Sequence, residues 1–308
     1  MASLALLVVV LAAKAGEQIA CGGPAPSRDG DAWERARGPV VAAFCDSVAQ
    51  GSARLGRDPT AAIAAADEAD ALLPDQAVVC VLRGRALVEL GRLREAQAVL
   101  ERGAALDPQT LSASPALLAL ARAQRGTKSA AAVTSYRALV PQTEGLATEE
   151  LRSRALLEAG EALLDEGPSG APEAIAVFGR LVASGDLSTR TRAKAWLALA
   201  LDRSGLTAEA SFLAAAATRE GAVVLVREKD AASASFGPLL ATLLAERDPV
   251  EAARVLRTFV DKLPPKSPWE KHARARIDAL SKQRPAARTS GAPTPAKKPA
   301  AISPKRRP

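Results

Sequence analysis

The sequence predicts an all-α protein in which pairs of antiparallel helices stack one after another. Apolar residues recur at helical spacing on both sides of a glycine turn in residues 77–110. Small residues, glycines and prolines return at steps of about 34 residues along much of the chain. Alanine dominates the 48% of hydrophobic residues and only 3% are aromatic, which favours closely packed helices over a β-sandwich or barrel.

The clearest helix pair is expected at residues 77–110. Its apolar stripe consists of Leu82, Leu87, Leu90, Leu93, Val99, Leu100 and Leu106. Gly91 supplies the turn between the helices, and Pro108 ends the second helix because proline has no amide proton to continue it. Gly84 stands where the two helices are expected to cross, and Ala96 is the small residue expected to face it.

This arrangement resembles a tetratricopeptide repeat. The family has small residues at positions 8 and 20 of its unit, glycine at 15 and proline at 32, and Gly84, Ala96, Gly91 and Pro108 stand there in this chain. The aromatic positions of the family hold Cys80, Leu87 and Leu100 instead. The resemblance implies a right-handed α-solenoid of antiparallel helix pairs that binds proteins.

The pattern predicts about six units, which begin near Ala43, Ala77, Ser112, Ser153, Thr191 and Ser233. Gly205 and Ala210 keep the register in the fifth unit, and Pro264 keeps it in the sixth. The β-branched run 222–226 is expected to be an extended connection, and a last helix over 269–282 is expected to cover the end of the stack. An irregular helical bundle and a HEAT or Sel1-type array are the alternatives.

The repeat domain is expected at residues 33–282, between two segments of different character. Residues 4–13 form an apolar run that is too short to span a bilayer and matches the core of a secretory signal. We therefore expect a signal peptide at 1–15 with cleavage near Ala15, a flexible segment at 16–32, and an exported protein of the periplasm or envelope. No basic residue precedes the apolar run, so a cytoplasmic location is the alternative.

Residues 283–308 are expected to form a disordered tail because they contain six prolines and almost no bulky apolar group. The net charge of +7 comes from this end of the chain, since eight of the 41 basic residues and none of the 34 acidic ones follow residue 280. An anionic surface is a candidate ligand for the tail. The contact residues would be Lys297, Lys298, Lys305, Arg306 and Arg307. A solubilising tail without a ligand is the alternative.

Three cysteines are present, and two of them fall in neighbouring repeats. Cys45 and Cys80 stand at positions 3 and 4 of adjacent first helices, so a disulfide between them is expected in an oxidising compartment. Two buried free thiols, or a bond between Cys21 and Cys45, are the alternatives. Lipidation of Cys21 is disfavoured because Gln18 stands where leucine is required.

Catalytic chemistry has no clear support in the sequence. His272 is the only histidine, so no HExxH zinc motif exists, and we expect it on a solvent-facing helix surface. The cysteines are not at metal-ligand spacing. We expect no enzyme activity, catalytic residue, metal, cofactor or small-molecule substrate.

The resemblance implies a concave groove that binds partner segments through positions 2, 5, 9, 12 and 13 of each first helix. The groove residues it gives include Phe44, Ser47 and Arg54 in the first unit, Val78, Val81, Arg85 and Glu89 in the second, and Arg192, Ala195, Leu199, Asp202 and Arg203, with Trp196 beside them, in the fifth. We expect a scaffold of the bacterial cell envelope with a protein partner. The alternative is a cytoplasmic adaptor that binds nucleic acid or another polyanion through its tail.

Overall fold

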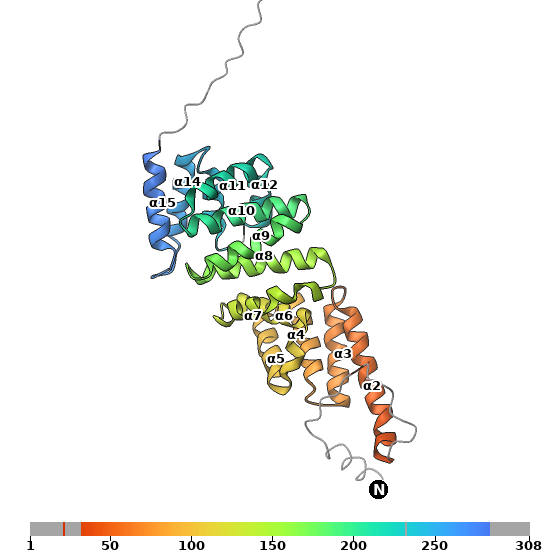
Figure 1. Ribbon diagram of the computed structural model, residues 1–308. Coiled ribbons are helices and arrows are strands. Elements are labelled where there is room, and N and C mark those ends of the chain that lie inside the picture. The colour runs from red at the N-terminus through yellow and green to blue at the C-terminus, as the bar shows by residue number, and fades with distance from the viewer. Residues whose placement is uncertain (1–20, 22–31, 232, 284–308) are drawn as a thin grey trace, which may run out of the picture.

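The computed structural model describes residue 21 and residues 32–231 and 233–283 (Figure 1). The predicted signal peptide at 1–15, nearly all of the segment 16–32 and residues 284–308 of the predicted tail lie outside these residues. The described chain is helical from Ala32 to Lys282 and contains no β-strand. The predicted all-α fold is therefore confirmed.

Six antiparallel helix pairs follow one another in the described residues, with two further helices outside the pairs. The pairs are α2 (Ala32–Arg54) with α3 (Pro59–Leu72), α4 (Ala77–Glu89) with α5 (Leu93–Leu106), α6 (Ser114–Gly126) with α7 (Ala131–Leu139), α8 (Glu149–Glu166) with α9 (Ala171–Ser184), α10 (Leu187–Arg203) with α11 (Thr207–Arg219), and α13 (Phe236–Leu244) with α14 (Pro249–Val260). The further helices are α12 (Ala222–Lys229) and α15 (Glu270–Lys282). Short 3-10 turns follow α5 and α7, at Pro108–Leu111 and Val140–Gly145.

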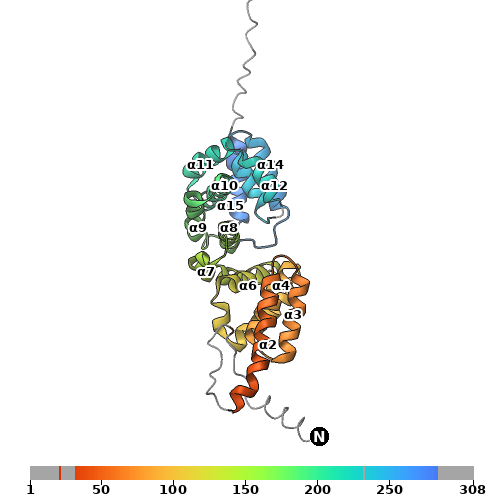
Figure 2. The ribbon, with the colours of Figure 1, turned by 90° about the vertical axis from the view of Figure 1, so that its right-hand side faces the viewer.

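The stack is elongated, and α8 crosses it between two groups of helices (Figures 1 and 2). Helices α2 to α7 lie on one side of α8, and α9 to α15 lie on the other. An apolar cluster joins α8 to the first group, with Tyr136 and Leu139 of α7 packed against Ala155 and Ala159 of α8. A larger cluster around Trp196 joins α8 to the second group.

Close approach of the helices in two pairs, α4 with α5 and α8 with α9, depends on glycine in the first helix. A Cβ added to Gly84 would lie 2.4 Å from Cγ of Leu100, and one added to Gly160 would lie 2.5 Å from the ring of Phe178. Gly84 therefore faces Leu100, whose side-chain atoms are the nearest to the added Cβ. That Ala96 also faces Gly84 stays a prediction. Ala96 is buried one helical turn away in the same cluster. At each crossing a large side chain, Leu100 or Phe178, fills the space that the glycine leaves open.

The other repeat-defining residues have identifiable structural roles. Gly91 and Gly205 adopt φ values of +73° and +83°, the left-handed region that glycine enters without steric cost, in the turns after α4 and α10. Pro108 follows the end of α5 and begins a 3-10 turn. Ala210 is buried in α11, and Pro264 lies in the connection from α14 to α15.

Residues 222–226 form the first part of α12, so the expectation of an extended connection is wrong. Gly221 has a φ of +88° and reverses the chain directly after α11, which allows a new helix to begin at once. Val226 is fully buried in the cluster around Trp196. Burial against the core thus outweighs the weak preference of valine for strands.

The last helix, α15, covers the end of the stack as predicted and is tied to distant helices. The indole N–H of Trp269, at the start of α15, donates to the backbone oxygen of Leu164 in α8 over 2.7 Å. The ring of Trp269 carries the Arg203 guanidinium over its face at 4.3 Å. Residues 105 apart in sequence are therefore held together at this point.

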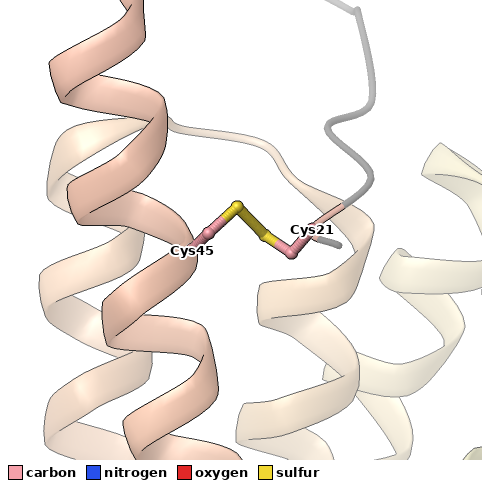
Figure 3. The surroundings of a disulfide bond; sticks show 2 residues. All are labelled: Cys21 and Cys45. Atoms are coloured by element: carbon pink, nitrogen blue, oxygen red, sulfur yellow. A yellow bond between two sulfur atoms is a disulfide. The ribbon is translucent and has the colours of Figure 1, made fainter. Parts of the chain in front are cut away.

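Cys45 is bonded to Cys21, and Cys80 is a buried free thiol (Figure 3). The expected bond between Cys45 and Cys80 is therefore wrong. Cys45 lies half-buried on α2, whereas Cys80 is buried beside Gly103 of α5, its own partner helix. Positions 3 and 4 of a helix differ by about 100° in direction, so the two sulfurs face different neighbours. Burial also raises the pKa of the Cys80 thiol, although Arg102 and Arg83 oppose this shift.

Substitution of Gly84 tests the helix crossing. Gly84→Ala should lower the free energy of unfolding by about 1–3 kcal/mol because Leu100 is fully buried and has little room to withdraw. Gly179→Ala is the matched control, since its added Cβ would meet no atom within 4 Å. That change should instead stabilise the helix by about 0.5–1 kcal/mol. Urea unfolding followed by circular dichroism measures both, and equal effects would contradict the proposed crossing.

Candidate functional site

A groove of about 1140 Å³ lies across α8. Its lining comes from the end of α6, one face of α8, the start of α10 and the end of α12. These residues are Arg125, Lys128, Glu150, Ser153, Arg154, Leu157, Glu158, Glu161, Asp165, Asp186, Ser188, Thr189, Arg192, Glu228, Lys229, Asp230, Ser233 and Ala234. Helices α6, α8 and α10 are the first members of their pairs, so the groove lies where the resemblance places the concave surface.

Arginine–carboxylate pairs connect α6 to α8 along the groove. Arg122 lies 2.8 Å from Glu158, and Arg125 lies 2.6 Å from Glu161 and 3.8 Å from Asp165. The four side chains of the two shorter pairs are each less than 30% exposed. These contacts hold the helix pair α6–α7 against the helix pair α8–α9. Salt screens them less than exposed ion pairs, because their side chains are partly buried.

Two carboxylates of the groove are incompletely neutralised. Burial raises the pKa of Glu161, against the lowering effect of Arg125, and the charges of Asp230 and Asp165 raise it further. Burial also raises the pKa of Asp165, against Arg125 and Arg203. Asp165 keeps 43% of its side chain exposed, so solvent stabilises its charge more than that of Glu161, which is 12% exposed.

The side of the groove formed by α10 and α12, called here the far wall, depends on Asp230, which ends α12. Its side chain is 2% exposed and forms an ion pair with Arg192 of α10. It also accepts a hydrogen bond from the indole N–H of Trp196 at 3.4 Å. An interior aromatic residue and a groove arginine are thus held by one carboxylate, which fixes α12 against α10.

A second hollow of about 840 Å³ adjoins the groove and shares Arg125, Arg154 and Glu158 with it. Glu89, one of the expected groove residues, lines this hollow. Its carboxylate accepts a hydrogen bond from the backbone N–H of Gly56 at 2.8 Å. Glu89 therefore fixes the turn between α2 and α3 while it faces the hollow.

Several expected groove residues belong to the interior. Phe44, Trp196, Leu199 and Arg203 are buried, so the expectation that they line an open surface is wrong. Trp196 stacks on Phe178 with ring centroids 5.9 Å apart. Helices α12, α13 and α15 pack over the face of α10 that the family pattern assigns to a partner.

The α15 contacts also correct the expectation for His272. Its Nε2 lies 3.1 Å from Asp202 Oδ2, and Arg276 Nε lies 3.2 Å from Oδ1 of the same carboxylate, at an angle outside that of a hydrogen bond. His272 therefore faces α10 and is only 30% exposed.

Burial lowers the pKa of Arg203 to about 10, although Asp165 and Asp202 oppose this shift.

The expected groove residues of the first two units lie outside the large groove. Val78, Val81 and Arg85 are half-buried on α4, and Arg54 is exposed at the end of α2. Burial lowers the pKa of Arg85, and Glu89 only partly offsets this effect. Among the expected residues, Arg192 lines the large groove.

The fourth unit supplies the groove residues that we did not name from the sequence. Counting from Ser153, positions 2, 5, 9 and 13 are Arg154, Leu157, Glu161 and Asp165, and all four line the groove. The family positions were therefore sufficient to find them. Arg125, Lys128 and the α12 residues lie outside those positions, and the sequence carried no comparable signal for them.

The described residues contain no group of three histidine, cysteine or acidic side chains arranged to hold a metal ion. The charges of the groove pair with one another across helices, and this arrangement is suited to recognising a complementary charged segment.

Removal of Asp230 tests the far wall. Asp230→Ala should lower the free energy of unfolding by about 3 kcal/mol because it leaves the largely buried Arg192 without its ion-pair partner. Glu95→Ala is the control, since Glu95 pairs with Arg92 on an exposed helix face. We expect no resolvable change of the urea midpoint in the control. A similar midpoint for both variants would show that Asp230 does not hold α12.

A family model agrees with this helical architecture over part of the chain. Residues 53–121, from the end of α2 into α6, match the family model described as tetratricopeptide repeat. The crystal structure of the P58(IPK) TPR domain aligns with 84% of this chain and 72% of that chain, at 13% identity and a TM-score of 0.34. No curated protein matches the sequence. Residues 53–121 of this chain therefore contain tetratricopeptide repeats.

Proposed function

We propose that this protein is a scaffold that binds a segment of a partner protein in the groove across α8. The tetratricopeptide fold supports a role in protein–protein interaction. The observation that carries the proposal is the groove itself, which is lined by charged side chains of both signs from four helices. Mixed charges favour a complementary pattern of charges on the partner and reject segments of the wrong sign.

Ion pairs within the chain fix two arginine side chains of the groove, which supports recognition of a defined partner. Arg125 and Arg192 are fixed by Glu161 and Asp230, so binding does not require these arginines to become ordered. Lys128 and Glu150 also line the groove, and neither forms an ion pair with another described residue. They are available to opposite charges on a partner segment.

We also propose that the protein acts in the bacterial cell envelope. The bond between Cys21 and Cys45 supports an oxidising compartment, since disulfides persist there and are rare in the cytosol. Cleavage near Ala15 would keep Cys21 in the mature chain. No helix in the described residues is long and apolar enough to cross a membrane.

Site-specific photocrosslinking in cells tests the binding site. A photoreactive amino acid at Ser188 or at Glu150, two exposed groove positions, should crosslink the same partner protein. The same amino acid at Glu209, which is exposed on α11 outside the groove, should not. Equal crosslinking from Glu209, or different proteins from the two groove positions, would count against the groove as the binding site.

Analysis of the mature chain tests its location. The N-terminus should start near Gly16, and peptide mapping without reduction should find Cys21 joined to Cys45. Cys80 should react with an alkylating agent only after unfolding, because it is buried and burial raises its thiol pKa. An intact Met1 together with three reduced cysteines would contradict export.

A further inference from the structure

The groove across α8 carries an excess of negative charge. Seven of its lining residues are acidic and five are basic. The carboxylates of Asp230, Glu161 and Glu158 are the more deeply placed, with 2%, 12% and 17% of their side chains exposed. Among the bases, Arg154 extends into solvent and is 71% exposed. A cationic segment in the groove would meet this excess and would offset the burial that raises the pKa of Glu161.

Two of the acidic residues are free to pair with such a segment. Glu150 and Glu228 lie at different places along the groove, at the start of α8 and near the end of α12. Both are exposed, and neither forms an ion pair with another described residue. They mark two separated points at which a cation can bind without breaking an existing contact.

The chain itself contains a segment of matching chemistry. Residues 284–308 include seven lysines and arginines, six prolines and no acidic residue. Proline restricts the backbone to φ near −65° and disfavours helix, so less conformational entropy is lost when such a segment binds in an extended form. Basic residues occur near the start, the middle and the end of this segment.

The groove is within reach of this segment. Trp269, at the start of α15, donates to the backbone oxygen of Leu164, whose neighbour Asp165 lines the groove. The 13 residues of α15 extend about 20 Å from that point. The 25 residues that follow residue 283 span up to about 80 Å when extended, which is enough to return to the groove.

We propose that residues 284–308 bind in the groove across α8 of their own chain. This inference rests on the proposed function, because it assigns an occupant to the same groove. A partner protein then binds by displacing the segment, and its own groove-binding part carries basic residues. The segment occupies Glu150 and Glu228 and leaves the arginine–carboxylate pairs of the wall intact.

Distance measurements between spin labels test the proposal in the full chain. Labels are attached at Ser188→Cys in the groove and Ala296→Cys in the segment. Only the introduced cysteines react, because Cys80 is buried and Cys21 and Cys45 are bonded to each other. A narrow distance distribution shorter than about 30 Å is expected at low salt, since a bound segment places Ala296 within the groove. It should become broad at 1 M salt, where the screening length falls to about 3 Å.

Paired charge variants make the test specific. Glu150→Lys with Glu228→Lys should abolish the short distances, because this pair reverses the excess charge of the groove. Glu209→Lys with Glu246→Lys changes the total charge by the same amount at exposed sites outside the groove. This control pair should preserve the short distances. A broad distribution at low salt, or equal effects of the two pairs, would overturn the proposal.

Dilution distinguishes the same chain from a second copy. The short distances should persist when the labelled protein is mixed with a tenfold excess of unlabelled protein. Their loss on mixing would place the segment in a second copy and would overturn binding within one chain. The crosslinking experiment on the groove does not depend on this result, because a partner can bind there whether or not the segment does.

Discussion

Arginine–carboxylate contacts join α8 to α6 beside the apolar core. An apolar cluster of nine buried side chains, with Tyr136 and Leu139 among them, also packs α6 and α7 against α8. Arg122 and Arg125 add directional contacts to that surface because each guanidinium reaches a carboxylate on the next unit. Arg125 lines the groove and Arg122 lines the adjoining hollow, so the joint between units and the candidate binding surface share residues.

This shared use explains why the groove is charged. A joint made of leucines would hold the units but would leave an apolar concave surface that favours aggregation. Glu161 and Asp165 instead remain only partly neutralised by Arg125, which burial alone would not favour. The groove thus keeps charged side chains at its surface, and apolar packing comes from the cluster around Trp196 and Phe178.

Much of the fold was predictable from the sequence because small residues at fixed spacing leave few packing solutions. Gly84 and Gly160 stand at the same position of their units, and each accepts a large side chain from its partner helix. The turn glycines Gly91 and Gly205 were recognisable for a similar reason, since few residues adopt their φ values readily. The helix α12 was not predicted, because its valines are common in strands and only the neighbouring core decides their conformation.

The candidate site was less predictable, because it depends on which faces the rest of the chain covers. Leu199 and Arg203 occupy family binding positions, but α13 and α15 pack over them. Cys45 and Cys80 were adjacent in register, but their directions on the helices differ. Glu161 and Asp165 obeyed the family spacing, and naming them required only that the fourth unit be treated like the second.

The coupling free energy between Arg125 and Glu161 is the most direct test of this account. It is obtained from urea unfolding of Arg125→Met, Glu161→Gln and the double variant, each compared with the unaltered protein. A charged hydrogen bond of 2.6 Å between largely buried side chains predicts a coupling of about 1–3 kcal/mol. A coupling below about 0.5 kcal/mol, the range of independent sites, would contradict the claim that this contact joins the units and shapes the groove.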